Sequence, residues 1–272
     1  MRAPPWLVLW EVPLAALLLA LLVAGGCFGD SDRLALSAKA KLLWEQGQYA
    51  DAARNFVTLA ELHPRGPLAE ESLFWAANLY HHFLQNPAEA IRNYQQLLVQ
   101  FSHGPYSDEA RENLAGLYEL DKGRRHRALQ IYQQMLLSDR QKDRRDYLQF
   151  KIAGLNLKMG IMDQARFEFR SLITQFPRSP FLPEAYYLVG YSYFLEERFP
   201  LALVALNQVG RDFPGTPLAR RAQFFAAEIL EEQGLFKEAL VAFRGLEGKY
   251  EKKKILRKRI ASLKARTRRS VR

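Results

Sequence analysis

The sequence predicts an all-α protein: a right-handed α-solenoid of six helical hairpins, closed by a basic C-terminal capping helix. Small residues recur at intervals of 37 or 38 residues, and each is followed four residues later by a large apolar residue. This period is typical of stacked helical hairpins, because neither helix of a hairpin can bury its apolar face alone. The small anchors are Ala52, Ala90, Ala128, Ala165, Ala202 and Ala239, and their large partners are Phe56, Tyr94, Tyr132, Phe169, Leu206 and Phe243.

The composition is globular, with its excess charge at one end. Of the 272 residues, 49% are hydrophobic and one is cysteine, which excludes disulfide-scaffold, collagen-like and wholly disordered chains. The formal net charge is +10, but residues 252–272 hold eleven basic residues and no acidic one. Residues 27–251 hold 27 basic and 28 acidic residues, so the body of the chain is electrostatically ordinary.

Residues 1–26 have the layout of an export signal. Arg2 precedes an apolar run over residues 14–24, which two glycines close before Cys27. The run is short for a bilayer span, and lengthening it would bury Glu11 and Pro13 in lipid, so a permanent transmembrane anchor is the lesser alternative. Small residues running into a cysteine, here Ala24-Gly25-Gly26-Cys27, resemble a bacterial lipobox.

The lipobox resemblance implies that Cys27 becomes the lipidated first residue of the mature chain. Phe28 follows the cysteine, and in the resembled lipoproteins this favours transport to the outer membrane. The alternative is an ordinary secretory signal with an unmodified or intermolecularly paired Cys27. Residues 27–33 are expected to form a short linker to the repeats.

Residues 34–250 are predicted to form the six hairpins. Glycine stands five residues before the anchor in four units, where a tight turn between helices needs positive φ. Proline stands twelve residues after the anchor in three units, where it ends the second helix. The glycines are Gly47, Gly123, Gly160 and Gly234, and the prolines are Pro64, Pro177 and Pro214.

The order of these signals resembles the tetratricopeptide repeat, most completely in the segment from Gly47 to Ala52 with Phe56 and Pro64. The junctions Phe176-Pro-Arg-Ser-Pro180 and Phe213-Pro-Gly-Thr-Pro217, behind a lipobox, are similar to those of BamD-type barrel-assembly lipoproteins and of the Tol-Pal coordinator family. This resemblance implies a non-catalytic protein-interaction scaffold. A sixth unit and a basic tail are departures from the five units of BamD.

In the resembled repeat the first helix of each hairpin lines a concave face. Positions fifteen residues before each anchor, and those four and seven residues further on, therefore predict a groove with an aromatic middle and charged ends. Such a groove suits a peptide held by aromatic anchors. The alternative is that the aromatic residues pack against neighbouring hairpins or a lid. The candidates are Trp44, Trp75, Leu79, Phe150, Tyr187, Tyr191, Phe194 and Phe224.

The tail, residues 251–272, combines an apolar stripe of Leu256, Ile260 and Leu263 with a cationic surface. The stripe predicts a helix that caps the last repeat. The cationic surface is either simply solvated or a contact for anionic lipid, acidic glycan or an acidic partner. Its candidate residues are Lys252, Lys253, Lys254, Arg257, Lys258 and Arg259.

Motifs for catalysis or for binding a metal or cofactor are not found in the sequence, which contains no metal-ligand spacing, phosphate loop or nucleophile elbow. His81 and His82 are adjacent on a predicted helix, so we expect their side chains not to face one site. We therefore expect no enzyme, no metal, no cofactor and no nucleic-acid partner.

The sequence is interpreted as that of a lipid-anchored scaffold at the periplasmic face of the outer membrane. Its groove would bind envelope proteins or peptides, and the leading process is assembly of outer-membrane barrel proteins. Alternatives are Tol-Pal or peptidoglycan coordination, or an adaptor for secretin or pilus assembly. From other classes, a peptide or glycan receptor or a helical lytic enzyme is less favoured.

Overall fold

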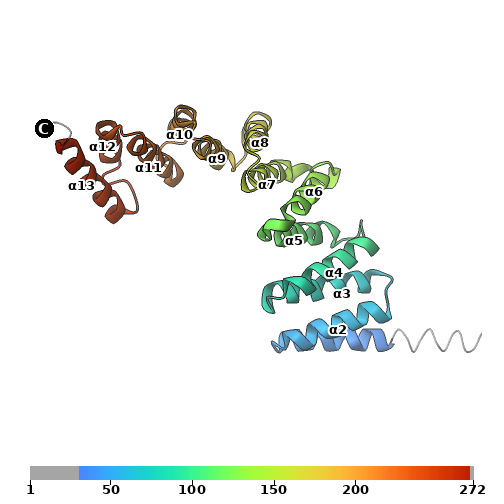
Figure 1. Cartoon of the computed structure of the whole chain (residues 1–272). Helices are drawn as coiled ribbons and strands as arrows, with labels where there is room; N and C mark the ends of the chain where they lie inside the picture. Colours follow the sequence, from blue (N-terminus) through green and yellow to red (C-terminus); the bar gives the residue numbers. More distant parts are fainter. Residues whose placement is uncertain (1–30, 270–272) are drawn as a thin grey trace, which may run out of the picture. The chain divides into compact units, whose positions relative to one another are not determined.

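The computed structural model describes residues 31–269, and every regular element in that range is a helix (Figure 1). The export signal, Cys27 and residues 270–272 lie outside the described residues. The chain is helical over residues 31–45. The α-helices that follow are α2 (Tyr49–Leu62), α3 (Pro67–Asn78), α4 (Pro87–Gln100), α5 (Ser107–Leu120), α6 (Arg125–Leu136), α7 (Arg145–Lys158), α8 (Met162–Gln175), α9 (Leu182–Leu195), α10 (Phe199–Asp212), α11 (Pro217–Glu232), α12 (Phe236–Arg244) and α13 (Lys253–Arg269). A π-helical turn, η1 (Leu79–Phe83), and two 3₁₀ turns, η2 (Lys122–Arg124) and η3 (Asp139–Arg144), lie between them.

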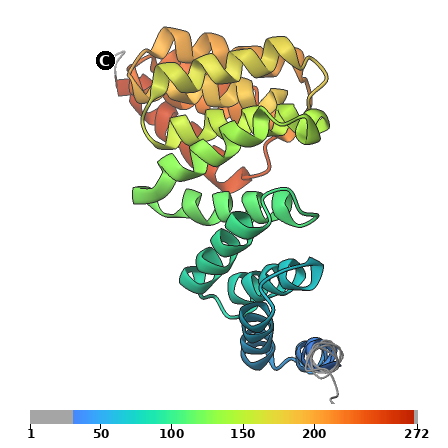
Figure 2. The same ribbon diagram turned by 90° about the vertical axis from the view of Figure 1, so that its right-hand side faces the viewer.

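The chain forms two compact units, which divide between Leu117 and Tyr118. Unit 1 contains α2 to α4 and most of α5, and unit 2 contains α6 to α13. Within each unit, helices that follow one another in the chain pack side by side, as α2 does with α3 and α9 with α10 (Figure 2). This arrangement confirms the predicted all-α array of helical hairpins followed by one further helix.

The anchor positions are the most completely buried part of each hairpin. All six anchor alanines have no exposed surface, and their six large apolar partners are at most 1% exposed. A methyl group lets the two helices approach closely, and the ring or leucine one turn later on the same face fills the remaining space. The sequence period therefore predicted the core correctly.

The turns between paired helices confirm three of the four glycine predictions. Gly47, Gly160 and Gly234 have φ values of 75°, 79° and 76°. The prediction for Gly123 was wrong, because it lies in the 3₁₀ turn η2, where the Asp121 side chain accepts a hydrogen bond from its N–H. The two units without glycine place Gln85 (φ 49°) and Glu197 (φ 57°) at the same turn position.

The prolines act as predicted at the ends of the second helices. The helices α2, α8 and α10 end at Leu62, Gln175 and Asp212, two residues before Pro64, Pro177 and Pro214. Each helix is followed by one residue outside the helical region of φ and ψ, because a following proline disfavours the helical conformation.

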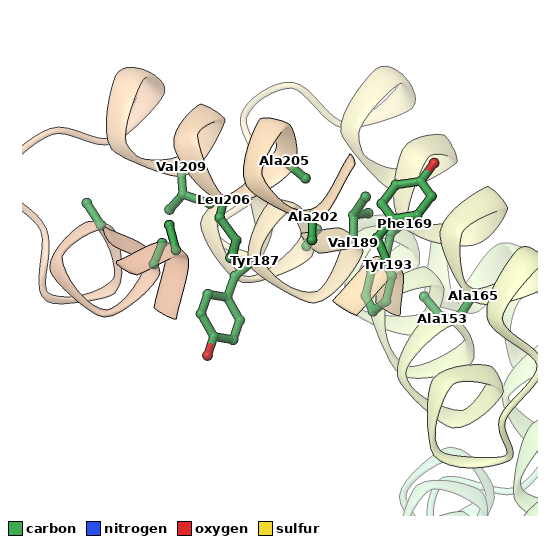
Figure 3. Close-up of a cluster of buried hydrophobic side chains, with 14 of the residues drawn as sticks. Ala153, Ala165, Phe169, Tyr187, Val189, Tyr193, Ala202, Ala205, Leu206 and Val209 are labelled. Carbon is green, nitrogen blue, oxygen red and sulfur yellow. The ribbon is translucent and has the colours of Figure 1, made fainter. Parts of the chain in front are cut away.

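Unit 2 has a continuous core built from α7 to α11. Figure 3 shows Phe169, Val189, Tyr193 and Ala202 together at one end of this core, and Leu206 and Val209 further along α10. At Gly190 the backbone of α9 approaches α10 so closely that an added Cβ would lie 2.8 Å from Cγ of Leu206.

The last helix covers the end of the last hairpin. Leu256, Ile260 and Leu263 are 3%, 4% and 0% exposed, and they pack in one cluster with residues of α11 and α12. The predicted capping helix is confirmed. Among residues 31–269, no helix has both the length and the apolar character needed to span a bilayer.

Candidate functional site

Four aromatic side chains of unit 2 gather where α9 meets α11. The ring of Phe225 lies 6.0 Å from that of Tyr187, 6.1 Å from that of Tyr191 and 4.9 Å from that of Phe194, measured between centroids. The three α9 residues share a side of the helix because they are spaced by four and three positions. We call Tyr187, Tyr191, Phe194 and Phe225 the aromatic face.

The members of the aromatic face differ in exposure. Tyr187 is buried, with the guanidinium of Arg221 4.9 Å from its ring centre, and burial raises the pKa of the Tyr187 hydroxyl. Its ring points away from Leu206 and Val209 (Figure 3). The other three rings are half-buried. Each of the three therefore has open surface for a partner.

An open pocket of about 590 Å³ adjoins the aromatic face. Phe194 and Phe225 line one part of it, and three carboxylates of α11 line another. We call it the acidic pocket; its carboxylates belong to Glu228, Glu231 and Glu232.

Two arginines of α13 reach into the acidic pocket. Arg259 pairs with Glu228 at 2.9 Å and with Glu231 at 3.3 Å, and Arg266 lies 3.8 Å from Glu231. Burial raises the pKa of Glu228, and Arg259 offsets part of that rise. The guanidinium of Arg266 also lies 5.5 Å from the ring centre of Phe236. The pocket thus accommodates guanidinium groups beside both carboxylates and an aromatic ring.

Aromatic rings next to carboxylates form a recognition surface for a segment that carries an apolar and a cationic side chain. The residues of the aromatic face and of the acidic pocket include no nucleophile paired with a base. Within residues 31–269 there is no group of three or more His, Cys, Asp or Glu side chains placed to hold a metal ion.

Three of the predicted groove residues, Leu79, Tyr187 and Phe224, are buried, so they offer little of their side chains to a partner in this structure. Leu79 is 1% exposed in unit 1. Phe224 is 7% exposed and stacks on Tyr250 at 4.5 Å, with Phe243 at 5.0 Å. Its neighbour Phe225, which the sequence analysis did not select, joins the aromatic face instead. The signal was the adjacent pair of phenylalanines: successive helix residues point about 100° apart, so the two rings could not lie on the same side of α11.

The remaining predicted groove residues form separate contacts. Phe150 stacks on Phe181 at 5.0 Å within unit 2. Trp44 and Trp75 lie 4.7 Å apart within unit 1, and both are half-buried. The structure therefore describes a tryptophan pair in unit 1 and an aromatic face in unit 2, and the peptide-binding role of these residues stays a prediction.

The basic candidates of the tail divide into two groups. Arg259 is held by carboxylates of the acidic pocket. Lys252, Lys253, Lys254, Arg257 and Lys258 are exposed.

The histidine pair differs from expectation. The rings of His81 and His82 stack with centroids 4.1 Å apart, so the prediction that they do not face one site was wrong. They lie in the π-helical turn η1, where the N–H of Leu84 bonds the carbonyl of Leu79 five residues back. This wider turn rotates the chain less per residue, which brings successive side chains together.

Stacked helical hairpins with a buried alanine and a large residue one turn later define the class of helical-repeat proteins. Two sequence models, both described as tetratricopeptide repeat, match residues 37–105 with 197–252 and residues 147–179. Together they cover more than half of the chain, which belongs to the tetratricopeptide-repeat family. Neither model describes a catalytic family. No curated protein sequence matches the chain.

Solved structures share the fold at low identity. A chain of the Naa15/Naa10 complex bound to HypK-THB is 17% identical with a TM-score of 0.61, and the match covers 89% of this chain and 36% of that one. YrrB, described as a TPR protein with an unusual peptide-binding site, is 19% identical with a TM-score of 0.50, covering 69% and 89%. PilW, described as a type IV pilus biogenesis factor, is 14% identical with a TM-score of 0.50, covering 79% and 92%.

Proposed function

We propose that the chain is a non-catalytic scaffold that binds a segment of a partner protein along the aromatic face and the acidic pocket. The observation that carries this proposal is the contact of Phe225 with three rings of α9, beside the carboxylates of α11. The partner segment would place an apolar side chain against Tyr191 and Phe225 and a lysine or arginine near Glu232. Membership of a family of protein-interaction repeats supports this function over catalysis.

We further propose that the scaffold is exported and held at the periplasmic face of the outer membrane by a lipid on Cys27. The support is the sequence Ala24-Gly25-Gly26-Cys27 after an apolar leader. Three acyl chains would anchor the protein firmly, because each buried methylene contributes about 0.8 kcal/mol. Assembly of outer-membrane barrel proteins is the proposed process. Pilus or secretin assembly is the second candidate, since a chain of similar fold is described as a pilus biogenesis factor.

Site-specific photocrosslinking tests the binding surface. A photoreactive phenylalanine analogue replaces Tyr191 in the full chain, produced in a bacterial host, and a matched control replaces Val204, which is 62% exposed on α10. We expect adducts at position 191 but not at 204, and we expect Phe225→Ala to abolish them. Equal adducts at both positions, or adducts at 191 that survive Phe225→Ala, would contradict the proposed surface.

The identity of the crosslinked protein tests the process. Barrel proteins or their assembly machinery support the first candidate, pilus or secretin subunits support the second, and cytosolic proteins alone would contradict both.

Intact mass with membrane fractionation tests the anchor separately. We expect a mature chain that begins at Cys27 with added acyl mass in the membrane fraction, and Cys27→Ser should lose that mass. An uncleaved or unacylated product would remove the anchor and the reason for preferring an outer-membrane process, and would leave the binding surface to be judged by crosslinking.

A further inference from the structure

The cations of α13 lie on two different sides of the helix. Its buried side carries Leu256, Ile260 and Leu263. Arg259 and Arg266 lie on one flank, where they reach Glu228 and Glu231. Lys254, Arg257, Lys258, Lys264 and Arg268 are neither buried nor paired with these two carboxylates.

Successive residues of an α-helix are rotated by about 100°, since 3.6 residues make one turn. On this basis Lys254 and Lys258 project from the side opposite the buried stripe, and Arg257, Lys264 and Arg268 from the flank away from Arg259 and Arg266; all five are exposed. No ion pair joins any of these five to a carboxylate among residues 31–269, and α13 itself contains no acidic residue. We call these residues the outer basic face.

The outer basic face is linear and continuous. A helix rises about 1.5 Å per residue, so the seventeen residues of α13 extend about 25 Å. Ala261 and Ala265 lie between the cations, so no bulky group interrupts the face. A row of long basic side chains around small residues can approach a flat anionic surface with all its charges at once.

The side chains of this face favour lipid headgroups over nucleic acid. Sequence-tolerant binding of single strands relies on aromatic rings that stack on bases, and direct base readout uses asparagine or glutamine beside arginine. The outer basic face has no aromatic ring and no amide side chain.

We propose that the outer basic face of α13 is an electrostatic docking surface for an anionic phospholipid bilayer. Arg259 and Arg266 hold the helix on the repeats, and the outer cations contact the headgroups. This contact needs neither the lipid on Cys27 nor a bound partner, so its test is independent of the proposed function.

A fluorescent reporter on the helix itself tests the proposal. In full-length chain carrying Cys27→Ser, the Ala261→Cys variant has a single cysteine, which is labelled with a polarity-sensitive dye. Vesicles of phosphatidylglycerol and phosphatidylcholine in equal parts are compared with vesicles of phosphatidylcholine alone. We expect a blue shift only with the anionic vesicles, and we expect salt to weaken it.

A matched pair of double variants separates the face from net charge. Arg257→Gln with Lys264→Gln removes two outer cations, and Arg244→Gln with Lys249→Gln removes two exposed cations outside α13. Each cation near an anionic surface contributes about fivefold in affinity, so the first pair should raise the lipid needed for half-maximal shift about 25-fold. The second pair should leave it nearly unchanged.

Three results would overturn the proposal. The first is that the dye does not respond to anionic vesicles. The second is that both pairs of substitutions weaken the response equally. The third is that the dye responds to double-stranded DNA through Arg257 and Lys264 but not to vesicles. Since all four substituted residues are exposed, loss of folding does not account for these results, and unfolding curves of the variants check this directly.

Discussion

The close approach of α9 and α10 at Gly190 leads to a prediction about two glycines that look alike in the sequence. Both Gly154 in α7 and Gly190 in α9 lie inside a helix, where alanine is ordinarily favoured over glycine by about 1 kcal/mol. At Gly154 nothing lies within 4 Å of an added Cβ. At Gly190 the added carbon would lie 2.8 Å and 3.0 Å from Cγ and Cδ2 of Leu206, and 3.3 Å from the carbonyl oxygen of Ala202.

These distances give opposite signs for the two substitutions. Gly154→Ala should raise the free energy of unfolding by about 0.5–1 kcal/mol, because the helix gains propensity and loses no contact. Leu206 is fully buried and cannot swing into solvent. Gly190→Ala should therefore cost about 1–3 kcal/mol of overpacking, which exceeds the gain in propensity, for a net loss of up to about 2 kcal/mol.

Urea unfolding followed by far-ultraviolet circular dichroism measures both variants against the parent chain. The expected result is a midpoint that rises for Gly154→Ala and falls for Gly190→Ala, with unchanged helix content before the transition. If Gly190→Ala were stabilised as much as Gly154→Ala, the packing of α9 on α10 described above would be wrong.

Four further substitutions test three separate features of the repeats. Phe224→Ala should destabilise the chain by about 3–5 kcal/mol, because the ring is buried between Phe243 and Tyr250. Phe225→Ala should destabilise the chain less and should remove crosslinking at position 191. Thermal melting of the two variants compares their stabilities. Glu197→Gly should raise the free energy of unfolding by about 0.5–1 kcal/mol, because φ is 57° at this residue and glycine removes the strain of the left-handed conformation. An unchanged or lower melting temperature would argue against that strain. Burial by itself would raise the pKa of Glu119, but hydrogen bonds from Lys151 and Lys158 outweigh it and lower that pKa below the ordinary value of 4.5. A carboxyl group with a lowered pKa stabilises the fold at pH values above its ordinary pKa, and this stabilisation is lost as the pH falls through the lowered pKa. Glu119→Gln should therefore lower the free energy of unfolding by about 1 kcal/mol at neutral pH and leave it unchanged once wild-type Glu119 is protonated. A loss of stability that persists at acid pH would contradict this assignment.

The sequence was most informative about positions where one residue type alone satisfies the packing. The anchors were predicted to the residue, because only a small side chain permits the close approach of two helices, and its large partner follows one turn later. The capping stripe of Leu256, Ile260 and Leu263 was predicted for a similar reason. Its apolar spacing selects one face of a helix.

The candidate site was predicted less well, because its register is not fixed by the repeat. An offset of fifteen residues from the anchor selects Tyr187 on α9 and Phe224 on α11, which are both buried, whereas the half-buried ring on α11 is Phe225, one residue further on. A shift of one residue turns a side chain by about 100°, enough to exchange a surface residue for a buried one. The π-helical turn at His81 and His82 had no sequence signal, since it depends on which carbonyl the backbone N–H of Leu84 finds.

The ion pairs between α13 and α11 affect how the array comes apart. In a linear array each repeat is stabilised by its neighbours, so unfolding begins at the ends, where one neighbour is missing. Here the last hairpin has a neighbour on its outer side, because α13 is held by three buried apolar residues and by Arg259 and Arg266. Fraying at this end therefore begins with α13 itself, and the amide protons of α11 beneath it exchange with solvent only after the cap has opened.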